Sequence, residues 1–335
     1  MCCAHNALPT EVARPPNRGA LARSAPPFCM VDVRSYAHRV GPLLRISRPA
    51  FLALPVTLVA LGAAAATVEG VFDPTRTAVA LIGLVVLHIS VNALNEASDY
   101  ESGIDERTDA TPFSGGSKTL PDGHIDPRTA YRYGYLMAAI GALIGLWFLA
   151  VVGPLLIPVL VLGAVSVLAY TDYLTRYSLG ELFAGLGLGG LPVLGTAIVQ
   201  AGTVPTAAVV AAVPAFLLTF NLLLLNEFPD VAPDRFGNRK NLLHRFGRVW
   251  GGRLYALASA LVPMSILTGI LLGVVPITAI LALLASVAAV RPVAWTLRSP
   301  QAQPPESVLR DNVVFILATN GLLAVGLALP SVGLF

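Results

Sequence analysis

Long apolar segments separated by short polar ones follow one another from Ala50 to the end of the chain. Each apolar segment runs for about 18 or more residues, which is long enough for a helix to cross the hydrocarbon core of a bilayer. The pattern predicts about nine transmembrane helices, near residues 50–67, 75–95, 130–152, 155–172, 179–199, 206–226, 252–273, 277–296 and 312–330.

Composition and charge agree with an all-α helical bundle in a membrane. Hydrophobic residues make up 55% of the 335 residues and charged residues 12%, against about 25% in soluble domains, and the mean hydropathy is +0.72. All of the 22 lysines and arginines except Arg76 fall on one side of the predicted membrane. By the positive-inside rule, this asymmetry places the N-terminus in the cytoplasm and requires an odd number of spans. The positions of the basic residues are explained by the topology of the membrane protein, so a nucleic-acid partner is not expected.

The first 40 residues differ from the rest of the chain. Residues 1–29 are rich in Pro, Arg and Ala and lack apolar periodicity, which predicts a disordered tail over 1–40 and a transmembrane domain over 41–335. Cys2, Cys3 and Cys29 all lie in this tail, so catalysis by cysteine in the helical body is excluded. Met30 is a candidate for the true start of the protein. A mass spectrum showing that the native protein begins at Met1 would refute this hypothesis.

Two predicted helices lead into the same acidic motif. Leu-Asn-Glu-x-x-Asp ends at Asp99 after helix 75–95 and at Asp230 after helix 206–226. Both helices leave the membrane on the predicted cytoplasmic side. Repeats within a membrane protein commonly place a shared site at their interface, so the two motifs are expected to form one site.

Polar side chains recur at helical spacing through both motifs. Exposing them to lipid would cost several kcal/mol, so they should face the interior of the bundle. Carboxylates gathered without matching cations repel one another unless they are protonated or share a cation. A small number of oxygen ligands suits Mg²⁺, because water and substrate phosphate complete its coordination shell. One stripe consists of His88, Asn92, Asn95 and Asp99, and the other of Asn226, Asp230 and Asp234. His88 can equally form a hydrogen bond within the bundle without contacting a ligand.

Basic and glycine-rich segments lie beside the acidic motifs. Residues 111–118 offer backbone amides and the Lys118 charge to phosphate oxygens. Arg239 and Lys240 follow Asp234 closely and suit the same task, although anchoring at the membrane surface is the alternative interpretation. Acidic motifs, basic loops and an apolar interior together indicate a ligand with a diphosphate head and an apolar tail.

Several segments match one family pattern. Asn95-Glu96-x-x-Asp99 corresponds to Asn-Asp-x-x-Asp, and Asp230 and Asp234 correspond to a second Asp-x-x-x-Asp. With these motifs the chain resembles the UbiA superfamily of intramembrane prenyltransferases, from about Arg45 to the last helix. Segments 99–105, 112–117, 169–171, 179–183 and 193–200 look like its menaquinone branch, which prenylates 1,4-dihydroxy-2-naphthoate, and 238–247 is similar to its basic segment.

The chain departs from the family pattern at four positions. Glu96 stands where the family usually has Asp, Asn238 replaces Gly, Asn241 replaces Thr, and Pro233 enters the second motif. Glu keeps the carboxylate and lengthens its reach, so we expect metal binding to be retained.

The resemblance implies Mg²⁺-dependent transfer of an isoprenyl chain from a prenyl diphosphate to a small aromatic acceptor, 1,4-dihydroxy-2-naphthoate or a related quinone precursor. The expected location is a prokaryotic cell membrane with the site facing the cytoplasm, in contact with membrane lipid, and no protein partner is predicted. The implied metal ligands are Asn95, Asp99, Asn226, Asp230 and Asp234, and the implied catalytic residues are Asp99, Asp230 and Tyr170. The implied substrate-binding residues are Arg45 and Arg48 for an acceptor carboxylate and Lys118, Arg176, Arg239 and Lys240 for the diphosphate.

Two other functions fit the same residues. A terpene cyclase on the same scaffold would share every metal ligand and act on a prenyl diphosphate without an acceptor. An ion-coupled transporter would also carry repeats and paired acidic helix ends, although the acids here cluster on one face only.

Overall fold

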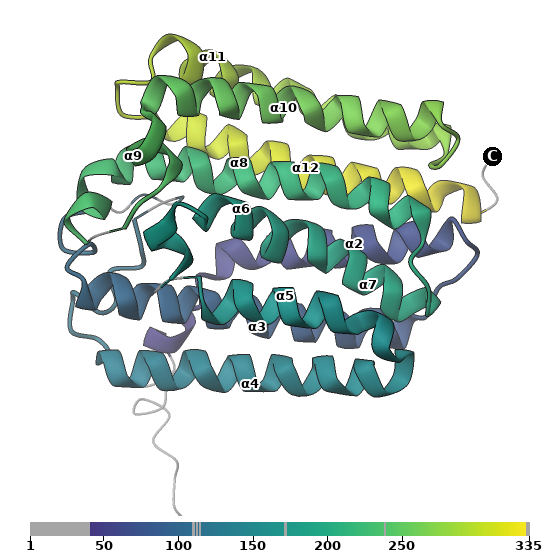
Figure 1. Ribbon diagram of the computed structural model, residues 1–335, viewed down its shortest axis with the longest axis horizontal. Helices are drawn as coiled ribbons and strands as arrows, with labels where there is room; N and C mark the ends of the chain where they lie inside the picture. The colour runs from purple at the N-terminus through teal and green to yellow at the C-terminus, as the bar shows by residue number, and fades with distance from the viewer. Residues whose placement is uncertain are drawn as a thin grey trace, which may run out of the picture.

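The computed structural model describes residues 41–332, apart from 109, 110, 112, 114, 171, 172 and 238. Its helices lie side by side along one common direction (Figure 1), and the described residues contain no strand, as predicted. The predicted tail over 1–40, with Met30 and the three cysteines, lies outside the described residues. The elements are η1 (Pro49–Leu52), α2 (Ala53–Thr67), α3 (Pro74–Glu101), α4 (Pro127–Val152), η2 (Pro154–Leu156), α5 (Ile157–Leu168), η3 (Leu174–Tyr177), α6 (Gly180–Gly185), η4 (Leu186–Gly190), α7 (Leu191–Ala201), α8 (Thr206–Phe236), α9 (Leu242–Phe246), α10 (Arg248–Leu271), η5 (Ile277–Ala289), α11 (Val290–Arg298), α12 (Glu306–Ala328) and η6 (Leu329–Val332).

Eight helical segments in the described part are long and apolar enough to cross a membrane. The predicted fourth span, 155–172, is shorter than expected: it consists of η2 and α5 and ends at Leu168. It ends there because the backbone amides of Tyr173 and Leu174 both turn back to the carbonyl of Ala169, which closes the helix. Among the described residues, the predicted bundle of about nine helices is therefore eight long apolar helices and one short one.

Helices α3 and α8 both continue beyond their predicted ends. The side chain of Asp73 starts α3 by accepting hydrogen bonds from the amides of Thr75 and Arg76, and α3 then runs to Glu101 rather than ending near 95. Helix α8 runs to Phe236, through Pro229 and Pro233, instead of ending near 226. Both acidic motifs therefore lie on helices, which fixes the direction of their side chains.

Small residues allow the central helices to pack closely. Alanines on α2, α8, η5 and α12 contribute to one large buried apolar cluster. A Cβ added at Gly62 of α2 would lie 2.6 Å from Thr196 Cβ and 2.6 Å from the carbonyl oxygen of Val193, both on α7. Only a glycine at position 62 permits this approach of the two backbones.

Replacing Gly62 should separate α2 from α7. We expect Gly62→Ala to destabilise the protein by about 1–3 kcal/mol because the rigid α7 backbone cannot give way, measured as a lower midpoint of thermal unfolding in detergent. Gly163→Ala on α5 is the matched control, since an added Cβ there meets nothing within 4 Å. It should leave the midpoint unchanged or raise it slightly. Equal midpoints for the two variants would contradict the close α2–α7 contact.

Candidate active site

A cavity of about 360 Å³ lies where α3 and α8 reach the end of the bundle that also carries α9. Carboxylate and amide side chains line one part of it, and Leu54, Leu188 and Ile316 line the apolar part. On α8 the lining begins at Thr219 and continues to Asp234, a rise of about 22 Å along the helix. The cavity therefore joins a polar end to an apolar interior, as a ligand with a charged head and an apolar tail requires.

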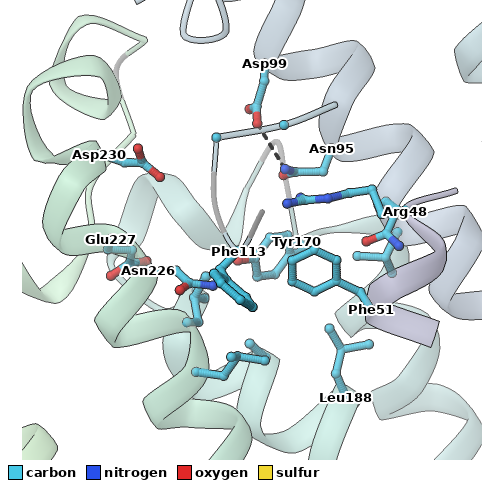
Figure 2. Close-up of a pocket in the computed structure, with 18 of the residues that line it drawn as sticks. Arg48, Phe51, Asn95, Asp99, Phe113, Tyr170, Leu188, Asn226, Glu227 and Asp230 are labelled. Carbon is cyan, nitrogen blue, oxygen red and sulfur yellow. Dashed lines mark hydrogen bonds between the residues drawn. The ribbon is translucent and has the colours of Figure 1, made fainter. Parts of the chain in front are cut away.

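The α3 side of the cavity is held by a small polar network. The side-chain amide of Asn95 donates to Asp99 Oδ2 at 3.0 Å, the hydrogen bond drawn in Figure 2. The guanidinium of Arg239 forms an ion pair with the other carboxylate oxygen of Asp99 and donates to Asn95 Oδ1 at 3.3 Å. Arg239 follows α8 in the chain, so this network ties α3 to the segment beyond α8.

The α8 side faces this network across the cavity, with the neighbours Asn226 and Glu227 on one turn and Asp230 on the next (Figure 2). Asp234 accepts a hydrogen bond from the side-chain amide of Asn241 at 3.0 Å. Among the described residues, Asn226 Oδ1, Glu227 Oε2 and Asp230 Oδ1 are buried and have no hydrogen-bond partner. Buried oxygens without partners are costly, and all three belong to the wall of one cavity.

These oxygens suit a hard cation. Mg²⁺ prefers oxygen ligands and keeps positions for water and substrate phosphate, and the predicted ligands Asn95, Asp99, Asn226, Asp230 and Asp234 all line the cavity. Within the described residues, however, no three His, Cys, Asp or Glu side chains are close enough together to hold a metal ion. The predicted ligands therefore form two half-sites on facing walls of the cavity, one on α3 and one on α8.

Glu96 does not line the cavity, unlike its neighbours in the motif. Its side chain is 1% exposed, accepts hydrogen bonds from the Ser117 amide at 2.7 Å and the Ser117 hydroxyl at 2.5 Å, and lies 4.0 Å from Arg48 Nε. The carboxylate at this position holds the 115–119 loop against α3.

The predicted basic residues divide into two groups. Arg48, Arg239 and Lys240 line the cavity, and the Arg48 guanidinium lies over the ring of Phe51, 4.3 Å from its centroid. Lys118 does not line it, because its ammonium donates to the backbone carbonyls of Asp105 and Thr108. Arg45 is exposed away from the cavity, and Arg176 lies in a neighbouring groove.

Tyr170 lines the cavity between α3 and α8 (Figure 2). Burial, and then the nearby Glu227 carboxyl, raises the pKa of Tyr170 well above its usual value. The residue therefore presents a neutral phenol to a ligand. Phe51 and Phe113 add two aromatic rings to the same cavity, neither of which was predicted.

Three acidic residues of this region had no predicted role. Glu227 and Asp105 line the cavity, and both belong to the motifs noted in the sequence. Glu181 on α6 is fully buried and accepts a hydrogen bond from the Leu242 amide at 2.6 Å, which holds α9 against α6. A lone acid at the start of an apolar span was the signal that could have identified Glu181.

Comparison with known proteins places this geometry in a family. Residues 53–320 match the model of the UbiA prenyltransferase family. The chain belongs to the UbiA prenyltransferase family. It is therefore an integral membrane prenyltransferase, and the alternative of an ion-coupled transporter is not supported.

Individual relatives agree with this family membership. The chain is 28% identical to 1,4-dihydroxy-2-naphthoate octaprenyltransferase of Escherichia coli over 302 residues, covering 87% of this chain and 96% of the relative. A UbiA homologue from Aeropyrum pernix shares the fold with a TM-score of 0.65 at 16% identity, covering 84% of this chain and 98% of the homologue. One from Archaeoglobus fulgidus, bound to GPP and Mg²⁺, has a TM-score of 0.57 at 14% identity, with coverages of 84% and 99%. The two structures support the UbiA fold.

Asp105 should make stability depend on pH. Burial, and then Asp99 and Glu96, raises the pKa of Asp105 to about 7, whereas an unfolded Asp titrates near pH ~4. Between these values the unfolded chain loses a proton that the folded chain keeps, so stability falls as pH rises. Asp105→Asn removes this loss.

We expect Asp105→Asn to raise the thermal midpoint above that of the unsubstituted protein at pH 8, and the difference to shrink at pH 5, both measured in EDTA. A difference that stays constant between these two pH values would show that the pKa of Asp105 is not raised.

Proposed function

We propose that this UbiA family enzyme transfers an isoprenyl chain from a prenyl diphosphate to an aromatic acceptor, and that the acceptor is 1,4-dihydroxy-2-naphthoate or a related quinone precursor. The observation that carries the proposal is the pair of facing oxygen-rich half-sites at the polar end of an otherwise apolar cavity. The acceptor is inferred from the name of the Escherichia coli relative and from the motifs of the menaquinone branch.

The diphosphate would lie between the two half-sites. Asn95 and Asp99 on α3, and Asn226, Asp230 and Asp234 on α8, would hold Mg²⁺, which supplies the positive charge that makes diphosphate a leaving group. Arg239 and Lys240 at the same end of the cavity would take up charge that remains on the phosphate oxygens.

The rest of the cavity would protect the reacting carbon. Cleavage of the carbon–oxygen bond leaves an allylic cation, and a site without water prevents its hydrolysis. The rings of Phe51, Phe113 and Tyr170 line the same space (Figure 2), and aromatic faces stabilise a nearby cation. The apolar residues beyond them would hold the isoprenyl chain.

Arg48 would bind the acceptor. Its side chain is 19% exposed, lies at the cavity wall and is 4.0 Å from Glu96, so part of its charge is free to pair with the carboxylate of an aromatic acid. Arg45, the other candidate, is exposed outside the cavity. The positive-inside asymmetry supports a cytoplasmic opening for this site.

Removing one carboxylate from either half-site should stop the reaction. We expect Asp99→Asn and Asp230→Asn each to lower Mg²⁺-dependent diphosphate release at least 100-fold, as loss of a catalytic electrostatic contact does (roughly 2.7–4 kcal/mol). Asp122→Asn, an exposed acid in the loop after α3, is the matched control and should keep its rate. Full release by either of the two site variants would refute this assignment.

The acceptor is tested by product analysis. Purified protein with geranylgeranyl diphosphate, Mg²⁺ and dihydroxynaphthoate should yield a prenylated adduct by mass spectrometry, and Arg48→Gln should raise the KM for the acceptor more than that for the diphosphate. Release of a cyclic hydrocarbon without any adduct would instead establish the terpene cyclase alternative.

A further inference from the structure

A second concave region, with a volume of about 520 Å³, adjoins the candidate active site. We call it the basic groove and define it by Arg176, Arg235, Arg239, Lys240, His244 and Arg245. None of the described residues that line it is acidic. The sequence predicted diphosphate binding for Arg176, Arg239 and Lys240, with membrane-surface anchoring as the alternative for Arg239 and Lys240, and the proposed reaction uses only Arg239 and Lys240.

Three short segments build the basic groove and hold one another in place. They are η3, the last turn of α8, and residues 239–246 including α9. The Lys240 amide donates to the carbonyl of Thr175 at 2.9 Å, which joins the third segment to η3. The His244 ring lies between two backbone groups: its Nδ1 accepts from the Asn241 amide at 3.3 Å, and its Nε2 donates to the Val231 carbonyl at 2.6 Å. The groove therefore has a fixed backbone frame.

Four of the five Lys and Arg residues of the groove have no acidic partner among the described residues, Arg239 being the exception. Arg176, Arg235, Lys240 and Arg245 are exposed, and within the described part of the chain none of them forms an ion pair. Cations that converge on one concave surface repel one another and create a field that attracts an anion. Guanidinium groups match phosphate oxygens in geometry as well as in charge.

The groove and the cavity meet at two residues. Arg239 and Lys240 line both. Arg239 is already engaged with Asp99 and Asn95, whereas Lys240 is exposed and close to both spaces. A phosphate group that leaves the polar end of the cavity would therefore meet the other groove cations next.

We propose that the basic groove binds phosphate oxyanions, and that its occupant is the inorganic diphosphate released from the cavity. The identity of this occupant rests on the proposed function. An anionic phospholipid headgroup carries the same phosphate chemistry and comes close to the same place: the Arg245 guanidinium lies 5.3 Å from the Phe246 ring centroid, and Phe246 packs on Trp250, an exposed aromatic pair typical of the membrane interface. Continuity with the cavity favours diphosphate.

Direct binding tests the groove without any turnover. The full-length protein is placed in phosphatidylcholine nanodiscs, and binding of radiolabelled inorganic diphosphate is measured in EDTA, so that no divalent metal contributes. We expect Arg235→Gln/Arg245→Gln to weaken binding at least tenfold, because two charge-assisted contacts are lost. Arg128→Gln/Arg298→Gln removes the same charge at two exposed sites outside the groove and should bind as the unsubstituted protein does. Equal affinity for both double variants would overturn the proposal.

Two further arms separate the possible outcomes. In the first arm, phosphatidylglycerol replaces part of the phosphatidylcholine. Its negative charge lowers the diphosphate affinity of every variant alike, so the readout is the ratio of the affinity of the unsubstituted protein to that of Arg235→Gln/Arg245→Gln. A ratio that persists supports diphosphate as the occupant, and one that collapses assigns the groove to lipid headgroups. If prenyl transfer is absent but the ratio persists in phosphatidylcholine, the proposed function fails while the phosphate site stands.

Discussion

The ion pair between Asp99 and Arg239 is the contact on which the site depends. Carboxylates from α3 and α8 meet at one end of an apolar bundle, where charge is poorly solvated and like charges repel. Arg239 is the cation that enters this group from beyond α8, and it binds Asp99 and Asn95 together. It thereby compensates the charge on α3 and joins α3 to the segment that follows α8.

The compensation is unequal on the two sides. The α3 carboxylate has a cation and an amide as partners, whereas buried oxygens of Asn226, Glu227 and Asp230 have none among the described residues. A ligand that brings positive charge to α8 therefore relieves a cost that folding alone leaves in place. Such a ligand stabilises the folded protein in proportion to the logarithm of its concentration.

The sequence was sufficient to predict five residues that line one cavity, because stripes at helical spacing in an apolar chain have few other interpretations. Asn95, Asp99, Asn226, Asp230 and Asp234 line one cavity for this reason. The lengths of α3 and α8 were not predictable in the same way. Polar residues and prolines after an apolar run usually indicate a loop, and only packing shows that both helices continue.

Side-chain direction was the other limit. Glu96 is one position from Asn95, about 100° around the helix, and so faces Ser117 and the 115–119 loop rather than the cavity. Lys118 was expected at the phosphate because of its charge, but it binds two backbone carbonyls of its own loop. Neither contact follows from residue type and spacing, because each depends on how a loop folds back onto α3.

The short fourth helix affects how the protein fits its bilayer. The three residues of η2 and 12 of α5 span about 22 Å as helix, less than the roughly 30 Å of a typical hydrocarbon core. On this side of the bundle the lipid must thin, or polar backbone after Leu168 must enter the membrane. Tyr170 follows this short helix and lines the cavity, so the thickness of the surrounding membrane becomes a variable that acts on the edge of the cavity.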